Sequence, residues 1–215
     1  MAWELSPQQV FNASPIVPVM VIKDLDDAVP MAQALLDGGI KIFEITLRTE
    51  CALDAIRLIS ESFPDVLVGA GTVLDTKQYD AAIEAGAKFI ISPGFTPELL
   101  DYATKQTVPL IPGVSTASEV MQARSYGYKH LKFFPAEANG GAPALKSISG
   151  PITDVQFCPT GGISPKNIGD YLAIGSVATA GGSWMLPESL LAAKDWSAIT
   201  QLTKEAVELV EGLTK

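Results

Sequence analysis

Charged side chains occupy one face of two short segments whose other face is apolar. Along residues 41–48, Glu44, Thr46 and Arg48 alternate with apolar residues, and along 130–134 Lys132 lies between two apolar neighbours. Side chains of a β-strand alternate between its two faces, so each polar set lies opposite an apolar face that packs on helices. The sequence therefore predicts that a carboxylate, a guanidinium and an amine point into the interior of a sheet.

A buried amine beside a carboxylate suits covalent chemistry on a carbonyl group. Loss of hydration disfavours the charged form of a lysine, and the neutral amine can attack a ketone and form a Schiff base. Glu44 can carry the protons for this reaction, although a nearby negative charge also favours the charged amine. Arg48 offers a rigid fork for a substrate carboxylate. A purely structural Glu–Lys–Arg network stays open as the alternative, because such side chains are rarely buried unless paired.

Two glycine pairs near the end of the chain predict an anion-binding site. Gly161-Gly162 follows one apolar run, and Gly181-Gly182 with Ser183 follows the next. Glycine lets backbone N–H groups approach an anion closely, and a serine adds a hydroxyl donor. One such pair would mark only a tight turn. Two pairs, both in the last two loops of a strand–helix repeat, favour phosphate.

The elements that position these residues form a repeat of strand and helix. Short apolar runs begin about 20 to 26 residues apart, which is room for one strand and one helix each. Such alternation implies a parallel sheet. The runs are 16–22, 41–47, 67–73, 89–92, 110–114, 130–134, 155–158 and 177–180.

Eight such units predict a (β/α)8 TIM barrel, an α/β fold, with an extra N-terminal helix over residues 6–13. The alternative is a doubly wound open sheet, but the glycine-rich turn that usually follows its first strand is missing after Ile22. The repeat runs through the whole chain without a low-complexity linker, which predicts a single domain of residues 1–215.

Helix boundaries carry their own signals. A hydroxyl residue before proline predicts a helix start, and Thr116 with Glu119 fits a capping box. A glycine before the next strand predicts a helix end with positive φ. The predicted starts are Ser6-Pro7, Thr96-Pro97 and Ser164-Pro165, and the predicted ends are Gly38-Gly39, Gly86, Gly127 and Gly175.

Composition narrows the function classes. Of 215 residues, 47% are hydrophobic and 18% are charged, and the net charge is −9. This mix excludes a disordered chain, and the negative charge makes a nucleic-acid or membrane partner unfavourable. The segment 5–22 holds three prolines and is not a membrane span. There are only two cysteines, Cys51 and Cys158, and they lie far apart, so we expect no disulfide framework. There is only one histidine, His130, so we expect no metal site. Residues 1–4 lack the basic start of a signal peptide, and we therefore expect a cytoplasmic protein.

Six motifs in order resemble the KDPG/KHG aldolase family, whose substrates are 2-dehydro-3-deoxy-6-phosphogluconate (KDPG) and 4-hydroxy-2-oxoglutarate (KHG). The resemblance covers residues 15–184. The motifs are Glu44-Ile45-Thr46-Leu47-Arg48-Thr49, Gly69-Ala70-Gly71-Thr72-Val73, Ile91-Ser92-Pro93-Gly94, the run from Lys132 to Gly141, Cys158-Pro159-Thr160-Gly161-Gly162-Ile163 and Gly181-Gly182-Ser183-Trp184.

This resemblance implies a class I aldolase, a carbon–carbon lyase of the Entner–Doudoroff pathway that needs no metal or other cofactor and forms a homotrimer in the bacterial cytoplasm. It implies cleavage of the phosphorylated 2-keto-3-deoxy acid KDPG to pyruvate and glyceraldehyde 3-phosphate, and of KHG to pyruvate and glyoxylate. The alternatives are a phosphate-binding isomerase or synthase in which Lys132 is only an electrostatic clamp, and a barrel that only binds phosphorylated metabolites.

The resemblance also implies a role for individual residues. Lys132 matches the Schiff-base lysine and Glu44 the acid/base carboxylate. Arg48 and Thr72 match the residues that hold the pyruvyl carboxylate, and Pro93 and Phe134 match the walls of the pyruvyl pocket. The residues that match the polar ring around the phosphate are Thr160, Gly161, Gly162, Gly182 and Ser183.

Overall fold

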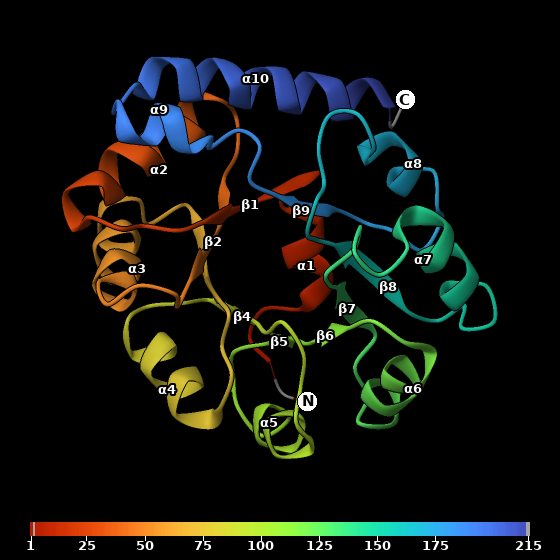
Figure 1. Cartoon of the computed structure of the whole chain (residues 1–215). Coiled ribbons are helices and arrows are strands. Elements are labelled where there is room, and N and C mark those ends of the chain that lie inside the picture. Colours follow the sequence, from red (N-terminus) through yellow and green to blue (C-terminus); the bar gives the residue numbers. More distant parts are fainter. Residues whose placement is uncertain (2, 214–215) are drawn as a thin grey trace.

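Parallel β-strands form a curled central sheet with helices around it (Figure 1). The computed structural model describes residues 1 and 3–213. Residue 2, which belongs to the N-terminal segment 1–4 without a basic start, and residues 214–215, which belong to the predicted domain 1–215, lie outside the described residues. Strands and helices alternate, so the chain has an α/β fold. The strands are β1 (Ile16–Met20), β2 (Ile42–Thr46), β3 (Leu67–Gly71), β4 (Phe89–Ile91), β5 (Leu110–Ile111), β6 (Gly113–Val114), β7 (His130–Phe133), β8 (Gln156–Pro159) and β9 (Ala180–Gly182).

The strands pair in two groups that follow one another around the curl. One group has the order β5–β4–β3–β2–β1–β9 and the other the order β6–β7–β8. Pro112 separates β5 from β6, and proline has no N–H with which to continue the hydrogen-bonded ladder. At the other end of both groups, isolated parallel bridges join Phe157 to Val177 and Thr160 to Gly181.

Helices connect the strands and cover the outer face of the sheet (Figure 1). The long helix α10 packs against α2. The helices are α1 (Pro7–Asn12), the 3-10 helix η1 (Leu25–Asp27), α2 (Ala28–Asp37), α3 (Ala52–Ser62), α4 (Thr76–Glu84), α5 (Pro97–Ala103), α6 (Ala117–Ser125), α7 (Gly141–Ser149), α8 (Ile168–Leu172), α9 (Glu188–Ala192) and α10 (Trp196–Leu213).

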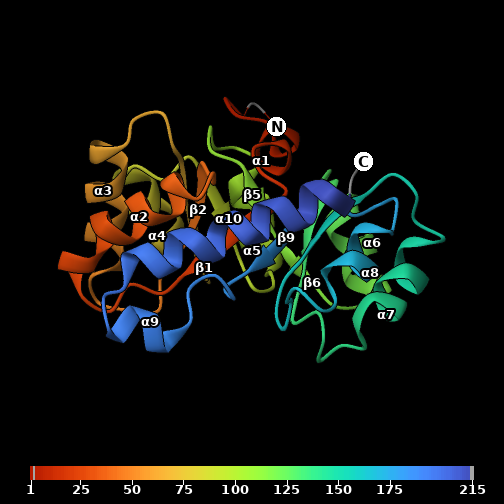
Figure 2. The same ribbon diagram turned by 90° about the horizontal axis from the view of Figure 1, so that it is seen from above.

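Helix α1 lies apart from this outer layer. In Figure 1 it lies within the ring of strands, and Figure 2 shows it at the opposite end of the sheet from α9. Gln8 Oε1 of α1 lies 2.9 Å from Nε2 of His130, the first residue of β7. The Phe11 ring contacts the same imidazole edge-on, with centroids 5.3 Å apart. The helix therefore packs against the amino-terminal end of β7.

Most sequence signals for the element boundaries are confirmed. Ser6 and Thr116 cap their helices in capping boxes, and Thr96 caps α5. The predicted helix ends at Gly39, Gly86 and Gly127 have positive φ. Apolar side chains from Val10 to Val210 form a connected buried core. Within the described residues, no helix is both long and apolar enough to span a membrane.

Four expectations are wrong. The predicted strand 110–114 is two strands, β5 and β6, which belong to different groups and are separated by Pro112. The last strand is Ala180–Gly182 rather than 177–180, so Gly182 belongs to a strand and not to the loop after it. This segment is a strand because it pairs with β1. Its two glycines give it no apolar pattern from which a strand could be predicted. Ser164-Pro165 does not start a helix, because Ser164 N and Oγ bond to Asn167 and α8 begins only after this turn. Gly175 lies outside the positive-φ region.

Candidate active site

Lys132 and Glu44 meet inside the curled sheet. Lys132 lies on β7 and Glu44 on β2, and both residues are buried, with 4% and 1% of their surface exposed. Lys132 Nζ donates a hydrogen bond of 2.9 Å to Glu44 Oε1. The predicted orientation of both side chains is therefore confirmed by this contact across the sheet interior. An amine and a carboxylate in direct contact can exchange a proton without a water molecule.

Small and aromatic residues shape the space around this pair. The Phe134 ring centroid lies 5.3 Å from Lys132 Nζ. A Cβ on Gly71 would overlap Glu44 Oε1, so glycine at this position makes room for the carboxylate. Gly113 is the strand partner of Lys132, and a Cβ on it would overlap the backbone oxygen of Pro93. Pro93 therefore lies close beside β6, the strand that pairs with the strand of Lys132.

Arg48 and Thr72 form a second contact just beyond the ends of β2 and β3. Arg48 Nε donates a hydrogen bond of 3.2 Å to Thr72 Oγ1. Thr72 has φ +60, in the left-handed region that β-branched residues rarely adopt. Such a backbone costs about 1–3 kcal/mol and occurs mostly where the surrounding structure needs it, often at functional sites. The two residues are well placed to offer a guanidinium and a hydroxyl to one carboxylate.

The two glycine-rich segments line one pocket together with Arg48. The pocket is bounded by Val19, Arg48, residues 160–163 and residues 181–183. Among the described residues, no acceptor binds the N–H groups of Gly161 and Gly162, while the carbonyl oxygens of Thr160, Gly161 and Gly162 all accept hydrogen bonds. Free N–H groups beside a guanidinium favour an anion. The predicted phosphate residues are thus brought together, and the two segments lie side by side, joined by the bridge between Thr160 and Gly181.

The sequence pattern missed Val19, which lines this pocket from β1. Residues 16–22 are apolar on both faces, so no alternation of polarity could have placed Val19 on the interior face, and only its pairing with Glu44 does so. Cys158 is the strand partner of Lys132 and is buried. Burial raises the pKa of the Cys158 thiol to about 12, an effect that nearby Lys132 opposes. Its thiol therefore stays protonated and unreactive at neutral pH.

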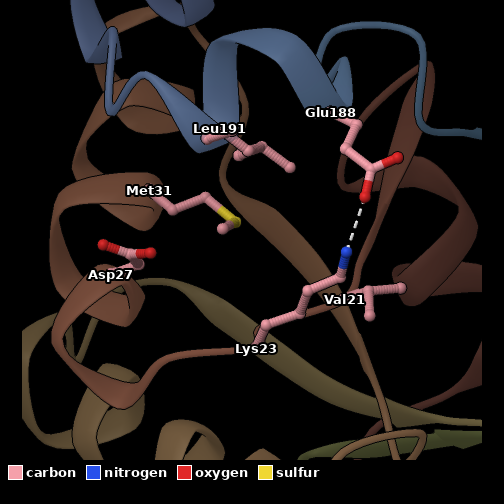
Figure 3. Close-up of a pocket in the computed structure, with 7 residues that line it drawn as sticks. Val21, Lys23, Asp27, Met31, Glu188 and Leu191 are labelled. Atoms are coloured by element: carbon pink, nitrogen blue, oxygen red, sulfur yellow. Dashed lines mark hydrogen bonds and ion pairs between the residues drawn. The ribbon is translucent and has the colours of Figure 1, made fainter.

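A second pocket lies between the β1–α2 connection and α9 (Figure 3). Lys23 Nζ and Glu188 Oε1 form an exposed ion pair 2.7 Å long beside it. The apolar side chains of Val21, Met31 and Leu191 also line it. It contains none of the residues that the sequence predicts for the site. Across residues 1 and 3–213, no group of three His, Cys, Asp or Glu side chains is placed to hold a metal ion.

The chain is similar to known aldolases along most of its length. The model of the KDPG and KHG aldolase family matches residues 8–202. The KHG/KDPG aldolase of Escherichia coli is 56% identical over 206 residues, which cover 96% of this chain and 97% of the relative. The 2-dehydro-3-deoxy-phosphogluconate aldolase of Pseudoalteromonas atlantica is 52% identical over 211 residues, or 98% of each chain.

A solved structure adds a chemical observation. The KDPG aldolase of Legionella pneumophila has a crystal structure with pyruvate captured at low pH as a covalent carbinolamine intermediate. It matches this structure with a TM-score of 0.93 and 52% identity, covering 95% of this chain and 99% of that one. On the family match and these relatives together, the chain belongs to the KDPG and KHG aldolase family.

Proposed function

We propose that this protein is a class I aldolase that cleaves KDPG to pyruvate and glyceraldehyde 3-phosphate. The observation that carries the proposal is the buried contact of 2.9 Å between Lys132 Nζ and Glu44 Oε1. The names of the relatives support the reaction, and the carbinolamine of the Legionella enzyme supports a covalent route through an amine.

The first stage forms an imine. A proton passes from Lys132 to Glu44 along their hydrogen bond, and the neutral amine attacks the C2 ketone of the substrate. Nitrogen loses a proton to the new alkoxide, which gives a carbinolamine. Glu44 returns its proton to the carbinolamine hydroxyl, which leaves as water. The product is a protonated imine on Lys132, with Glu44 again a carboxylate.

The second stage breaks the C3–C4 bond. Glu44 removes the C4 hydroxyl proton, and the C3–C4 bonding electrons move into the imine to give an enamine, while glyceraldehyde 3-phosphate departs. Glu44 then protonates C3. Water adds to the resulting imine, and pyruvate leaves as the amine and carboxylate return to their starting forms.

The remaining site residues hold the two anionic ends of the substrate. Arg48 and Thr72 bind the pyruvyl carboxylate, and Pro93 and Phe134 wall the carbon chain beside Lys132. The residues that bind the phosphate are Thr160, Gly161, Gly162, Gly182 and Ser183. Binding energy from the phosphate orients the reacting carbons, since it acts far from the bond that breaks.

The second substrate is KHG, which the same steps cleave to pyruvate and glyoxylate. It shares the pyruvyl half with KDPG and lacks the phosphate. The name of the Escherichia coli relative includes both substrates and supports this extension.

Reductive trapping tests the covalent step. Borohydride added with pyruvate should attach one reduced pyruvate to Lys132, as peptide mass spectrometry would show, and Lys132→Arg should abolish both the adduct and KDPG cleavage. An intact enzyme that turns over KDPG without forming the adduct would contradict the mechanism. An isomerase, a synthase or a simple binding protein would release no pyruvate from KDPG in a coupled assay.

The proposal extends to architecture and assembly. The two strand groups close into one (β/α)8 barrel with α1 as an additional helix, and residues 1–215 form a single domain; the bridges Phe157–Val177 and Thr160–Gly181 support closure. The resemblance supports a homotrimer in the bacterial cytoplasm, and the net charge of −9 argues against nucleic-acid partners. Analytical ultracentrifugation would test the trimer.

A further inference from the structure

The side chain of Glu137, which is not among the proposed site residues, packs against the Gly161-Gly162 loop. Glu137 lies in the connection between β7 and α7, and a Cβ on Gly162 would overlap the Glu137 side chain, 2.7 Å from its Cγ and 2.8 Å from its Cβ. Glu137 N donates to Gly161 O at 3.1 Å, and Ala136 N donates to Thr160 O at 2.8 Å. The β7–α7 connection thus fixes the carbonyl oxygens of Thr160 and Gly161 and leaves the N–H groups of Gly161 and Gly162 free of any acceptor in the described part of the chain.

A buried tyrosine holds Glu137 in this position. Tyr171 of α8 is fully buried, and its hydroxyl donates a hydrogen bond to Glu137 Oε1. Burial, and then the hydrogen bond to Glu137, raise the pKa of Tyr171, so the phenol stays a donor at neutral pH. Gly141, with φ +67, leaves the room that this contact needs, because a Cβ there would lie 3.2 Å from Glu137 Oε1.

Asn167 restrains the same loop through its side-chain amide. Its Nδ2 donates to Gly162 O at 3.0 Å, and its Oδ1 accepts from Ser164 N at 2.8 Å. Gly162 is therefore held by both the Glu137 side chain and the Asn167 amide. Glu137, Asn167 and Tyr171 all line one small pocket, which shares no lining residue with the anion-binding pocket.

The backbone of Gly161 and Gly162 needs this restraint, because glycine is conformationally free. Gly161 and Gly162 have φ of +103 and +79, a conformation that only glycine adopts easily. Glycine also loses the most conformational freedom when it becomes ordered. Free N–H groups bind an anion well only when they are already aimed at it, and misplacement by about 1 Å is costly.

We propose that Glu137, Tyr171 and Asn167 are positioning residues that hold the N–H groups of Gly161 and Gly162 toward the substrate phosphate. The inference rests on the proposed function, because it assumes that these N–H groups bind the phosphate of KDPG. None of the three residues contacts the reacting carbons. They act through the loop, so their effect should appear in binding of the phosphorylated substrate and not in the covalent chemistry.

The test compares two substrates in Tyr171→Phe and Asn167→Ala. We expect each change to raise KM for KDPG about tenfold, the effect of one weakened hydrogen-bonded contact to an anion, with kcat within about twofold of the wild type. The kcat/KM for unphosphorylated KHG should stay within about twofold. Glu137→Ala should match Tyr171→Phe, and Glu137→Gln, which keeps an acceptor for the phenol, should restore most of the affinity.

Tyr102→Phe is the matched control. It also removes a tyrosine–carboxylate hydrogen bond, from Tyr102 to Asp80 at 2.7 Å, but between α5 and α4, far around the sheet from α8 (Figure 1). It should leave both substrates unaffected. Equal losses on KDPG and KHG, or an unchanged KM for KDPG in Tyr171→Phe, would overturn the inference. A wild-type enzyme that fails to cleave KDPG at all would instead reject the proposed function.

Discussion

Lys132 Nζ lies 2.9 Å from Glu44 Oε1, although 88 positions separate the two residues in the chain. Their side chains are only 5% and 2% exposed. A buried ion pair loses much hydration, and its mutual attraction often does no more than offset that loss. The pair therefore adds little to stability compared with an apolar pair of the same size. We expect that it persists because of its chemistry.

Removing one partner of this pair should destabilise the protein more than removing both. Lys132→Met leaves Glu44 as a buried charge without a partner, which typically costs about 3–5 kcal/mol. Lys132→Met with Glu44→Leu should recover most of that loss, because no uncompensated charge remains. Urea unfolding of the single and double variants measures the difference. A double variant as unstable as the sum of the two single variants would contradict this account of the pair.

Gly71→Ala should disturb catalysis through Glu44. The added Cβ would overlap the Glu44 carboxylate, which must then move from Lys132. We expect kcat on KDPG to fall about 10²-fold, the usual effect of misplacing a reacting group by about 1 Å. Overpacking should also lower the free energy of unfolding by about 1–3 kcal/mol.

Gly175→Ala is the control for this change, because open space surrounds its Cβ position. It should leave kcat at the wild-type value. If Gly71→Ala retained full kcat, the position of the Glu44 carboxylate would not matter to the reaction.

Ser183→Ala should separate the two substrates. Ser183 lines the glycine-rich pocket and offers a hydroxyl to an anion there. A hydrogen bond to a charged group contributes about 1.5–3 kcal/mol, so kcat/KM for KDPG should fall about tenfold to a hundredfold. The value for KHG should change little, because that substrate has no phosphate. Steady-state assays with both substrates measure this difference. An equal loss of kcat/KM on KHG would contradict a role of Ser183 in binding the phosphate.

The repeating strand–helix order and the interior position of Lys132 and Glu44 could be predicted from the sequence. Polar and apolar residues alternate along 41–48 and 130–134, which identifies the face on which each side chain lies. The same inference can be made for any strand with one apolar face. The last strand was misplaced because Ala180-Gly181-Gly182 has no apolar pattern, and only its pairing with β1 makes it a strand. The capping signal at Ser164-Pro165 failed because Asn167 uses those groups for a turn.

The contacts between distant segments could not be predicted from local patterns. Nothing in the sequence links Glu137 to Tyr171, which are 34 positions apart. The φ of +60 at Thr72 could not be predicted either, because threonine rarely adopts a positive φ. The resemblance predicts a role for individual residues, whereas the structure supplies the hydrogen bonds between them.

His130 should make stability depend on pH in a narrow range. Burial against α1 lowers the pKa of His130 below its ordinary value of 6.5. Between the lower folded value and 6.5, the unfolded chain binds more protons than the folded chain, so stability rises with pH. The contribution is complete above about pH 6.5 and is lost as the pH falls through the folded pKa.

This range can be isolated because His130 is the single histidine of the chain. The pKa values of Glu119, Asp154 and Glu188 are lowered from their ordinary values of 4.5, 3.8 and 4.5. These carboxylates therefore make stability depend on pH only below those ordinary values. The urea midpoint of the wild type should therefore fall between about pH 7.5 and about pH 5, and that of His130→Gln should fall less. An NMR titration should place the imidazole midpoint below 6.5, and a midpoint above it would mean that burial against Phe11 and Gln8 does not set the charge of this side chain.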